Sequence, residues 1–272
     1  MRVLGLVIAL VFTPALLAHD TWIVPSTFRP KAGTTVQLRV ATGMNFPASE
    51  AAVTPDRVIR YTVHDNARVR KIGDYHVEGG FLVAETTPEL QGDTILSLEL
   101  KPRVLEMTAQ EFQEYLREER QEKILRLRAK QGRSNSPGHE RYRKIAKTVL
   151  CVGEGEDSTS LLSEGLLLEI LPEQSPCTYH AWDRVEFLVF SEAQPLANAR
   201  VVAGYQGATG HHYPVETTTD ADGRAAIVLK RAGAWFIRVL HIAPSADDPE
   251  ADWQTVFSTL TFEVQPEGRN VP

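Results

Sequence analysis

Alternating apolar and polar positions in the first part of the chain predict β-strands. The run TTVQLRV places Val36, Leu38 and Val40 on one face of an extended segment. The run DTILSLEL has the same two-residue period, and turn-rich pieces such as GMNFP and VEGG separate the apolar runs. These patterns predict an N-terminal β unit over residues 19–102.

A helical period replaces this alternation between residues 103 and 147. Thr108 and Glu111 have the spacing of a capping box, and apolar residues then recur at helical intervals. After the break QGRSNSPG, the serine and proline before ERYRKIAK are typical of a helix start. We therefore expect a small α-helical insertion over 103–147, with its many charges on a solvated face.

Short strands return after the insertion. The runs TVLCVGE and GLLLEILP predict a β hairpin over 148–175 that completes the first unit. Runs such as VEFLVF, AAIVLK and AWFIRVLHI follow over 176–272, with the spacing of an immunoglobulin-like β-sandwich. The expected fold class is mainly β, with two β-sandwich (immunoglobulin-like) units and a small α-helical insertion between them.

Residues 1–18 have the pattern of a secretory signal peptide. One charge, Arg2, precedes the apolar run Val3–Phe12, and small residues follow. The run is too short to span a bilayer comfortably. Cleavage after Ala18 is favoured over cleavage after Ala15, and it leaves 272 − 18 = 254 residues. We therefore expect a periplasmic protein that does not span the membrane once the leader is removed.

Composition and missing motifs narrow the function. The chain has 29 Lys and Arg against 35 Asp and Glu, a balance that argues against a nucleic-acid partner. Its two cysteines are too few for a four-cysteine zinc site; Cys151 and Cys177 either pair in an oxidising compartment or stay as buried thiols. The sequence has no nucleophile elbow, phosphate loop, dinucleotide fingerprint or HEXXH motif. We expect a protein that is not an enzyme.

The candidate chemistry lies in histidine. Cleavage after Ala18 would make His19 the first residue, with an α-amine and an imidazole that can chelate one ion. His241 is the best further ligand, because the alternation of AWFIRVLHI places it at the end of an apolar face. Asp20 is a weaker ligand or a partner of one. Nitrogen ligands of this kind suit a divalent transition metal: nickel, cobalt or copper. The alternative is that His19 merely follows a cleavage site and His241 is a satisfied core or rim residue.

A family resemblance supports the metal hypothesis. The segments AHDTWIVPSTFRPKAGTTVQL, TGMNFPASE and TDADGRAAIVLKRAGAWFIRVLHI, with others in the same order, resemble a family of bacterial periplasmic proteins. The family carries a domain of unknown function and is often described as a nickel-uptake-type, substrate-specific component. Its opening pattern maps onto Ala18, His19, Asp20 and Trp22, and its late strand ending in histidine maps onto Trp235–His241. The resemblance implies transition-metal handling, with a separate membrane transporter or outer-membrane receptor as partner.

Two other functions stay open. The β units are also typical of an adhesion or ligand-binding module in which the histidines are incidental, since sandwich folds host many roles. A copper-dependent oxidase would need an open coordination position and a substrate surface, and the sequence shows neither.

Overall fold

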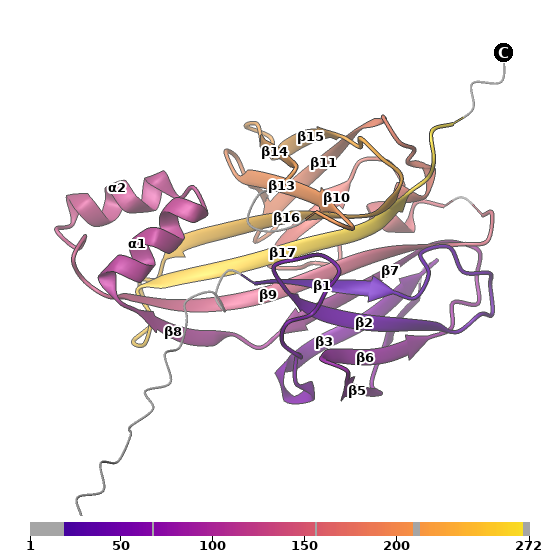
Figure 1. The fold of residues 1–272 in the computed structure, drawn as a ribbon, viewed down its shortest axis with the longest axis horizontal. Helices are drawn as coiled ribbons and strands as arrows, with labels where there is room; N and C mark the ends of the chain where they lie inside the picture. The colour runs from indigo at the N-terminus through magenta and orange to yellow at the C-terminus, as the bar shows by residue number, and fades with distance from the viewer. Residues whose placement is uncertain (1–18, 67, 156, 209–212, 269–272) are drawn as a thin grey trace, which may run out of the picture.

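The computed structural model describes residues 19–66, 68–155, 157–208 and 213–268. The predicted signal peptide, residues 1–18, and the last four residues of the predicted C-terminal unit lie outside these ranges. The described chain is mainly β, as the sequence predicted, with two short α-helices at one end of the molecule (Figure 1).

A nine-stranded sheet forms the centre of the fold. Its strands are β3 (Val58–Asp65), β4 (Arg68–Lys71), β7 (Gly92–Leu100), β8 (Arg103–Met107), β9 (Gly138–Val152), β13 (Arg200–Tyr205), β14 (Val215–Thr218), β16 (Gly233–Pro244) and β17 (Trp253–Val264). The order across the sheet is β14-β13-β16-β17-β9-β7-β3-β4, and β8 pairs with the first part of β9. β17 and β9 run parallel, so the two halves of the chain join at this pair.

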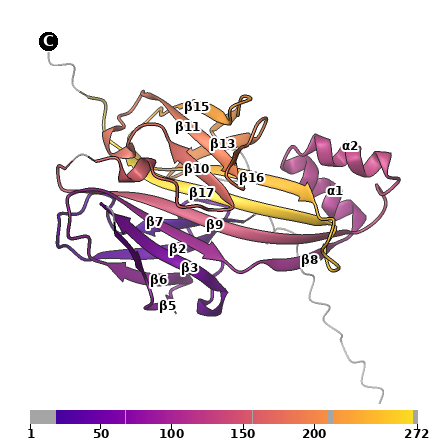
Figure 2. The same ribbon diagram turned by 180° about the vertical axis from the view of Figure 1, so that it is seen from behind.

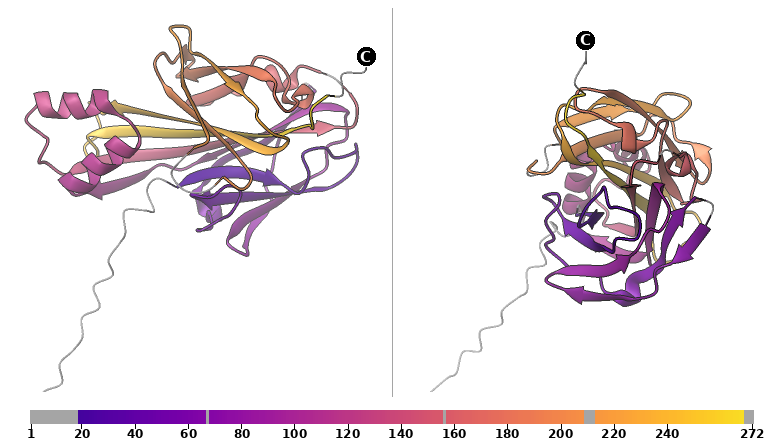
Figure 3. Two further views of the ribbon diagram at one scale, coloured as in Figure 1. Left: turned by 45° about the horizontal axis from the view of Figure 1, so that its top comes forward. Right: turned by 90° about the vertical axis from the view of Figure 1, so that its right-hand side faces the viewer.

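Two four-stranded sheets pack on opposite faces of the central sheet (Figure 3). The first contains β1 (Asp20–Pro25), β2 (Val36–Gly43), β6 (Phe81–Thr86) and β5 (Tyr75–Glu78). The second contains β10 (Leu168–Pro172), β11 (Arg184–Ser191), β12 (Gln194–Pro195) and β15 (Arg224–Val228). The molecule is thus two β-sandwiches that share one sheet.

The strand β9 shows how one sheet serves two cores. Ala146 and Leu150 belong to the apolar core of the first sandwich, whereas Ile145 and Val149 belong to that of the second. Successive side chains of a strand point to opposite faces, so a strand buried on both sides supplies both cores.

The helices α1 (Ala109–Glu118) and α2 (Glu122–Lys130) connect β8 to β9. The predicted capping box is confirmed, because the Thr108 hydroxyl accepts from the Glu111 backbone and the Glu111 carboxylate accepts from the Thr108 backbone. Phe112 and Leu116 of α1 pack with Trp253 against the far ends of the long strands (Figure 2). Neither helix in the described part of the chain is long and apolar enough to cross a membrane.

Two sequence predictions about the middle of the chain are wrong. ERYRKIAK forms part of β9 rather than a helix, because pairing with β17, β7 and β8 satisfies its backbone. β10 pairs with β11 and not with β9, so the predicted hairpin over 148–175 does not form. Its second half belongs to the second sandwich instead of completing the first.

Of the two states left open for the cysteines, the structure has the disulfide. Cys151 near the end of β9 is bonded to Cys177 in the short 3-10 turn η4 (Pro176–Thr178). This bond ties the central sheet to the segment that leads into β11.

Candidate functional site

His19 lies buried at the start of β1, with 4% of its surface exposed. The Lys144 ammonium of β9 donates to the His19 carbonyl oxygen at 2.5 Å. The His19 ring nitrogen Nε2 is 3.1 Å from the Glu50 carboxylate. Both the backbone and the ring of His19 are therefore held in place.

Asp20 is part of a buried ion-pair network. Its Oδ1 accepts from Arg238 Nε at 2.7 Å, and its Oδ2 accepts from the Tyr213 hydroxyl at 2.9 Å. Arg238 also donates to both carboxylate oxygens of Glu119, at 2.6 Å each. Burial alone would lower the pKa of Arg238, but the two carboxylates raise it above its ordinary value. Both Asp20 oxygens are engaged by protein groups, so Asp20 anchors β1 to the central sheet.

His241 lies on the other side of the central sheet from this network. The pairing of β16 with β17 continues without a break, so side chains alternate strictly between the two faces. His241 shares its face with Ile237 and Val239 in the core of the second sandwich, whereas Arg238 points toward β1. The predicted place of His241 at the end of an apolar face is confirmed, and burial lowers its pKa.

The predicted ligand set is not assembled in the structure. His19 directly precedes β1 and Asp20 begins it, but the central sheet separates both residues from His241. Across the ranges that the structure describes, no three His, Cys, Asp or Glu side chains form a group that could hold a metal ion. Any site at His19 must use its own nitrogens and groups on its own side of the sheet.

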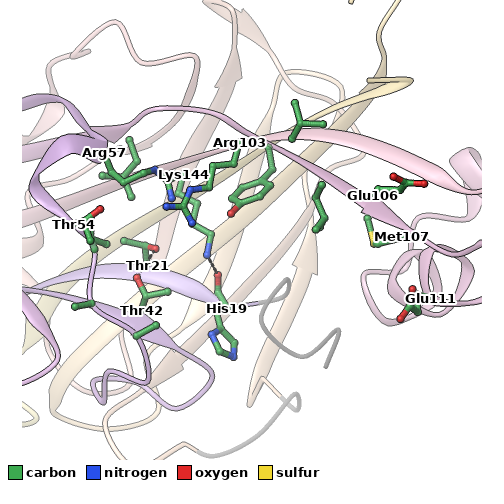
Figure 4. Close-up of a pocket in the computed structure, with 17 residues that line it drawn as sticks. His19, Thr21, Thr42, Thr54, Arg57, Arg103, Glu106, Met107, Glu111 and Lys144 are labelled. Carbon is green, nitrogen blue, oxygen red and sulfur yellow. Dashed lines mark hydrogen bonds between the residues drawn. The ribbon is translucent and has the colours of Figure 1, made fainter. Parts of the chain in front are cut away.

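A pocket of about 580 Å³ opens beside His19 (Figure 4). It lies between the start of β1, the segment before β3, and the paired strands β8 and β9. Three cationic side chains line it: Arg57, Arg103 and Lys144. Figure 4 shows them gathered at the end near His19, with Glu106 and Glu111 at the other end.

The cations that line the pocket lower one another's pKa values. Burial is the main cause that lowers the pKa of Lys144 to about 8. The charge of Asp20 opposes this shift, and the charges of Arg57 and Arg103 add to it. Burial also lowers the pKa of Arg57, again with a contribution from Arg103. The end of the pocket near His19 therefore has a positive electrostatic potential.

A second buried carboxyl lies next to the ion-pair network. Glu140 of β9 accepts from the Tyr115 hydroxyl of α1 at 3.1 Å. Burial raises the pKa of Glu140 to about 7, outweighing the hydrogen bonds from Thr255 and Tyr115. We use the name charged layer for the buried set Asp20, Glu119, Glu140, Lys144 and Arg238.

Sequence reasoning missed most of the groups around His19. Lys144 lies in the segment predicted as a helix, where its charge was assigned to a solvated face. Arg238 lies at a polar position of an alternating strand, and this pattern predicts that its side chain is exposed. In the structure only 2% of the surface of Arg238 is exposed. A polar residue in a strand that is buried on both sides must lie in a buried polar network. The sequence alone does not reveal that this strand is buried on both sides.

One family model matches most of the chain. The family described as Domain of unknown function (DUF4198) matches residues 16–243. The chain belongs to this family. None of the curated proteins matches the sequence.

Solved structures give only distant likenesses to this DUF4198 protein. The D0-D1 domain of intimin has 11% identity and a TM-score of 0.22 over 90% of this chain and 97% of that one. The fibronectin(III)-like modules of Clostridium thermocellum CbhA have 9% identity and a TM-score of 0.22, over 90% of this chain and 94% of theirs. The mouse nectin-like molecule 4 ectodomain has 10% identity and a TM-score of 0.22, over 93% and 66%. Likeness at this level carries no conclusion about function.

Proposed function

We propose that this protein is a periplasmic binding or delivery protein for a divalent transition metal, nickel, cobalt or copper, held at His19. The observation that carries the proposal is the 3.1 Å contact between His19 Nε2 and the Glu50 carboxylate. Histidines that bind metals commonly have one ring nitrogen on a carboxylate, which fixes the ring while the other nitrogen faces the metal.

The chemistry of an N-terminal histidine supplies the chelate. In a chain that begins at His19, the α-amine and Nδ1 belong to one residue and can bind one ion through a small ring. An α-amine loses its proton with an ordinary pKa of about 7.7–8.0, so metal binding near neutral pH is feasible. The Lys144 contact with the His19 carbonyl fixes the backbone of His19 beside the pocket that it lines.

The location of the site also fits a carrier. The pocket beside His19 is open, so an ion bound there would be accessible to a delivery partner such as a separate membrane transporter or an outer-membrane receptor. The proposal is for a carrier that does no chemistry on its cargo.

Calorimetric titration of nickel, cobalt and copper into three forms of the protein tests this proposal. The first begins at His19, the second keeps Ala18 before it, and the third is His19→Ala. We expect tight binding only by the first, because an extra residue converts the amine into an amide. Equal binding by the first and second forms would overturn the proposal.

His241→Ala is the matched control for this titration. It removes a histidine on the opposite face of the central sheet, so metal affinity is expected to stay unchanged. Oxygen consumption by the copper-loaded protein with a reductant separates a carrier from an oxidase, and we expect none.

A further inference from the structure

The cations at the positive end of the pocket are not neutralised by direct ion pairs among the described residues. In the described part of the chain, no carboxylate forms an ion pair with Arg57, Arg103 or Lys144. Arg57 donates to the Lys101 carbonyl at 2.8 Å, and Lys144 donates to the His19 carbonyl. Neutral carbonyl oxygens satisfy donors but do not neutralise charge.

A comparable buried cation on the other face of β9 has a carboxylate partner. Lys147 is as deeply buried as Lys144, and its ammonium lies 2.9 Å from the Glu169 carboxylate. Lys144 has only 6% of its surface exposed, and the one carboxylate whose charge favours its protonated form, Asp20, is already bound by Arg238. Arg57 and Arg103 add like charges on the pocket side of Lys144. Burying an unpaired charge is costly, and adding like charges beside it adds to the cost.

We infer that this pocket binds a small molecule through a carboxylate or phosphate group, held between Arg57, Arg103 and Lys144. The three cations come from separate elements: Arg57 from the turn before β3, Arg103 from β8 and Lys144 from β9. Arginine guanidinium groups bind such oxyanions through paired donors, and the ammonium adds a further charge-assisted hydrogen bond.

The size and composition of the pocket suit a small anionic ligand. Its volume of about 580 Å³ exceeds that of a lone inorganic ion, and apolar residues such as Val104 and Leu105 line it alongside the cations. Pockets of this size typically combine an apolar wall with a few polar anchors that orient the ligand. The acidic end near Glu106 would disfavour a molecule that is negatively charged along its whole length.

This inference stands apart from the metal proposal, because the cations would bind an anion whether or not His19 begins the chain. The two sites are nevertheless adjacent, since Lys144 touches the His19 carbonyl. A bound anion would offset the positive potential that otherwise disfavours a metal ion at this place.

The test is calorimetric titration of metal-free protein with citrate and, separately, with inorganic phosphate. We expect saturable binding of at least one of them, and the tighter of the two identifies the oxyanion class. Arg103→Gln is expected to weaken that binding roughly tenfold, because it removes one charge-assisted contact. Arg103 is exposed, so its replacement leaves the fold intact.

Lys101→Gln is the matched control. It removes an exposed cation two residues away that does not line the pocket, so affinity should be unchanged. The inference is overturned if neither anion binds, or if Arg103→Gln binds as well as the unaltered protein. Because these titrations contain no metal, their failure leaves the His19 proposal standing.

Discussion

The two faces of the long strands β9, β17 and β16 are built on different principles. Toward the second sandwich they present a largely apolar core that includes Ile237, Leu260 and Phe262, with one buried ion pair between Lys147 and Glu169. Toward β1 and α1 the same strands present the charged layer, with Arg238 between Asp20 and Glu119. Apolar packing stabilises by the area it removes from water, whereas a buried ion-pair network depends on every member being present. We therefore expect the face toward the second sandwich to tolerate single substitutions better than the face that carries the charged layer.

Removing the central cation of the charged layer should have the largest effect. Arg238→Met leaves the Asp20 and Glu119 carboxylates buried without their partner, and we expect a loss of about 4 kcal/mol in the free energy of unfolding. Urea denaturation measures this loss.

Arg117→Met is the control for that experiment, since it removes an exposed arginine of α1 and should change stability by less than about 0.5 kcal/mol. A loss below about 1 kcal/mol for Arg238→Met would show that the charged layer tolerates a missing member, which would erase the contrast between the faces.

Glu140→Gln should reveal the pH sensitivity of the charged layer. The raised pKa of Glu140 means that the folded state keeps a proton which the unfolded state releases from about pH 4.5 upward. Stability therefore falls as the pH rises from about 4.5 to about 7, and the loss is complete above that. The variant should lack this decline and exceed the parent at pH 8 by on the order of 3 kcal/mol.

Denaturant melts at several pH values check this expectation. Glu114→Gln, an exposed carboxylate on α1, should keep the decline of the parent. If the plots of stability against pH for Glu140→Gln and the parent are parallel, Glu140 has the same protonation state in the folded and the unfolded protein, which contradicts this prediction.

The apolar face should give the smallest effect. Ile237→Val removes one methylene from the core of the second sandwich, and we expect a loss of about 1 kcal/mol. Because no titrating group is touched, the loss should be the same at pH 5 and pH 8. A loss that varied with pH would indicate that the two faces are coupled through β16.

Sequence patterns predicted the parts of the fold whose burial is one-sided or strictly apolar. The alternation of AWFIRVLHI correctly placed His241 on the apolar face of β16, and the capping box correctly marked the start of α1. The segment ERYRKIAK was mistaken for a helix because a strand with charges on both faces has no apolar period of two.

The candidate site was predicted only in part for a related reason. His19 was singled out by its chemistry, but its contacts with Glu50 and Lys144 join positions far apart in the chain. Asp20 was expected to be a weaker metal ligand or a partner of one. Its engagement with Arg238, more than two hundred residues later, depends on β1 lying across the long strands.

The position of β17 has a consequence for the order in which the protein acquires its structure. This strand comes last in the described chain yet lies in the middle of the central sheet, between β16 and β9. Its threonines also hold β1, since Thr259 and Thr261 donate to the Thr21 and Ile23 carbonyl oxygens. Leu260 and Phe262 of β17 belong to the core of the second sandwich, so that sandwich cannot close before β17 has paired, and such long-range pairing makes folding slow. The strands that precede β17 in the second sandwich therefore expose apolar surface until this strand has formed, which makes β17 decide how long the unfinished fold is prone to aggregate.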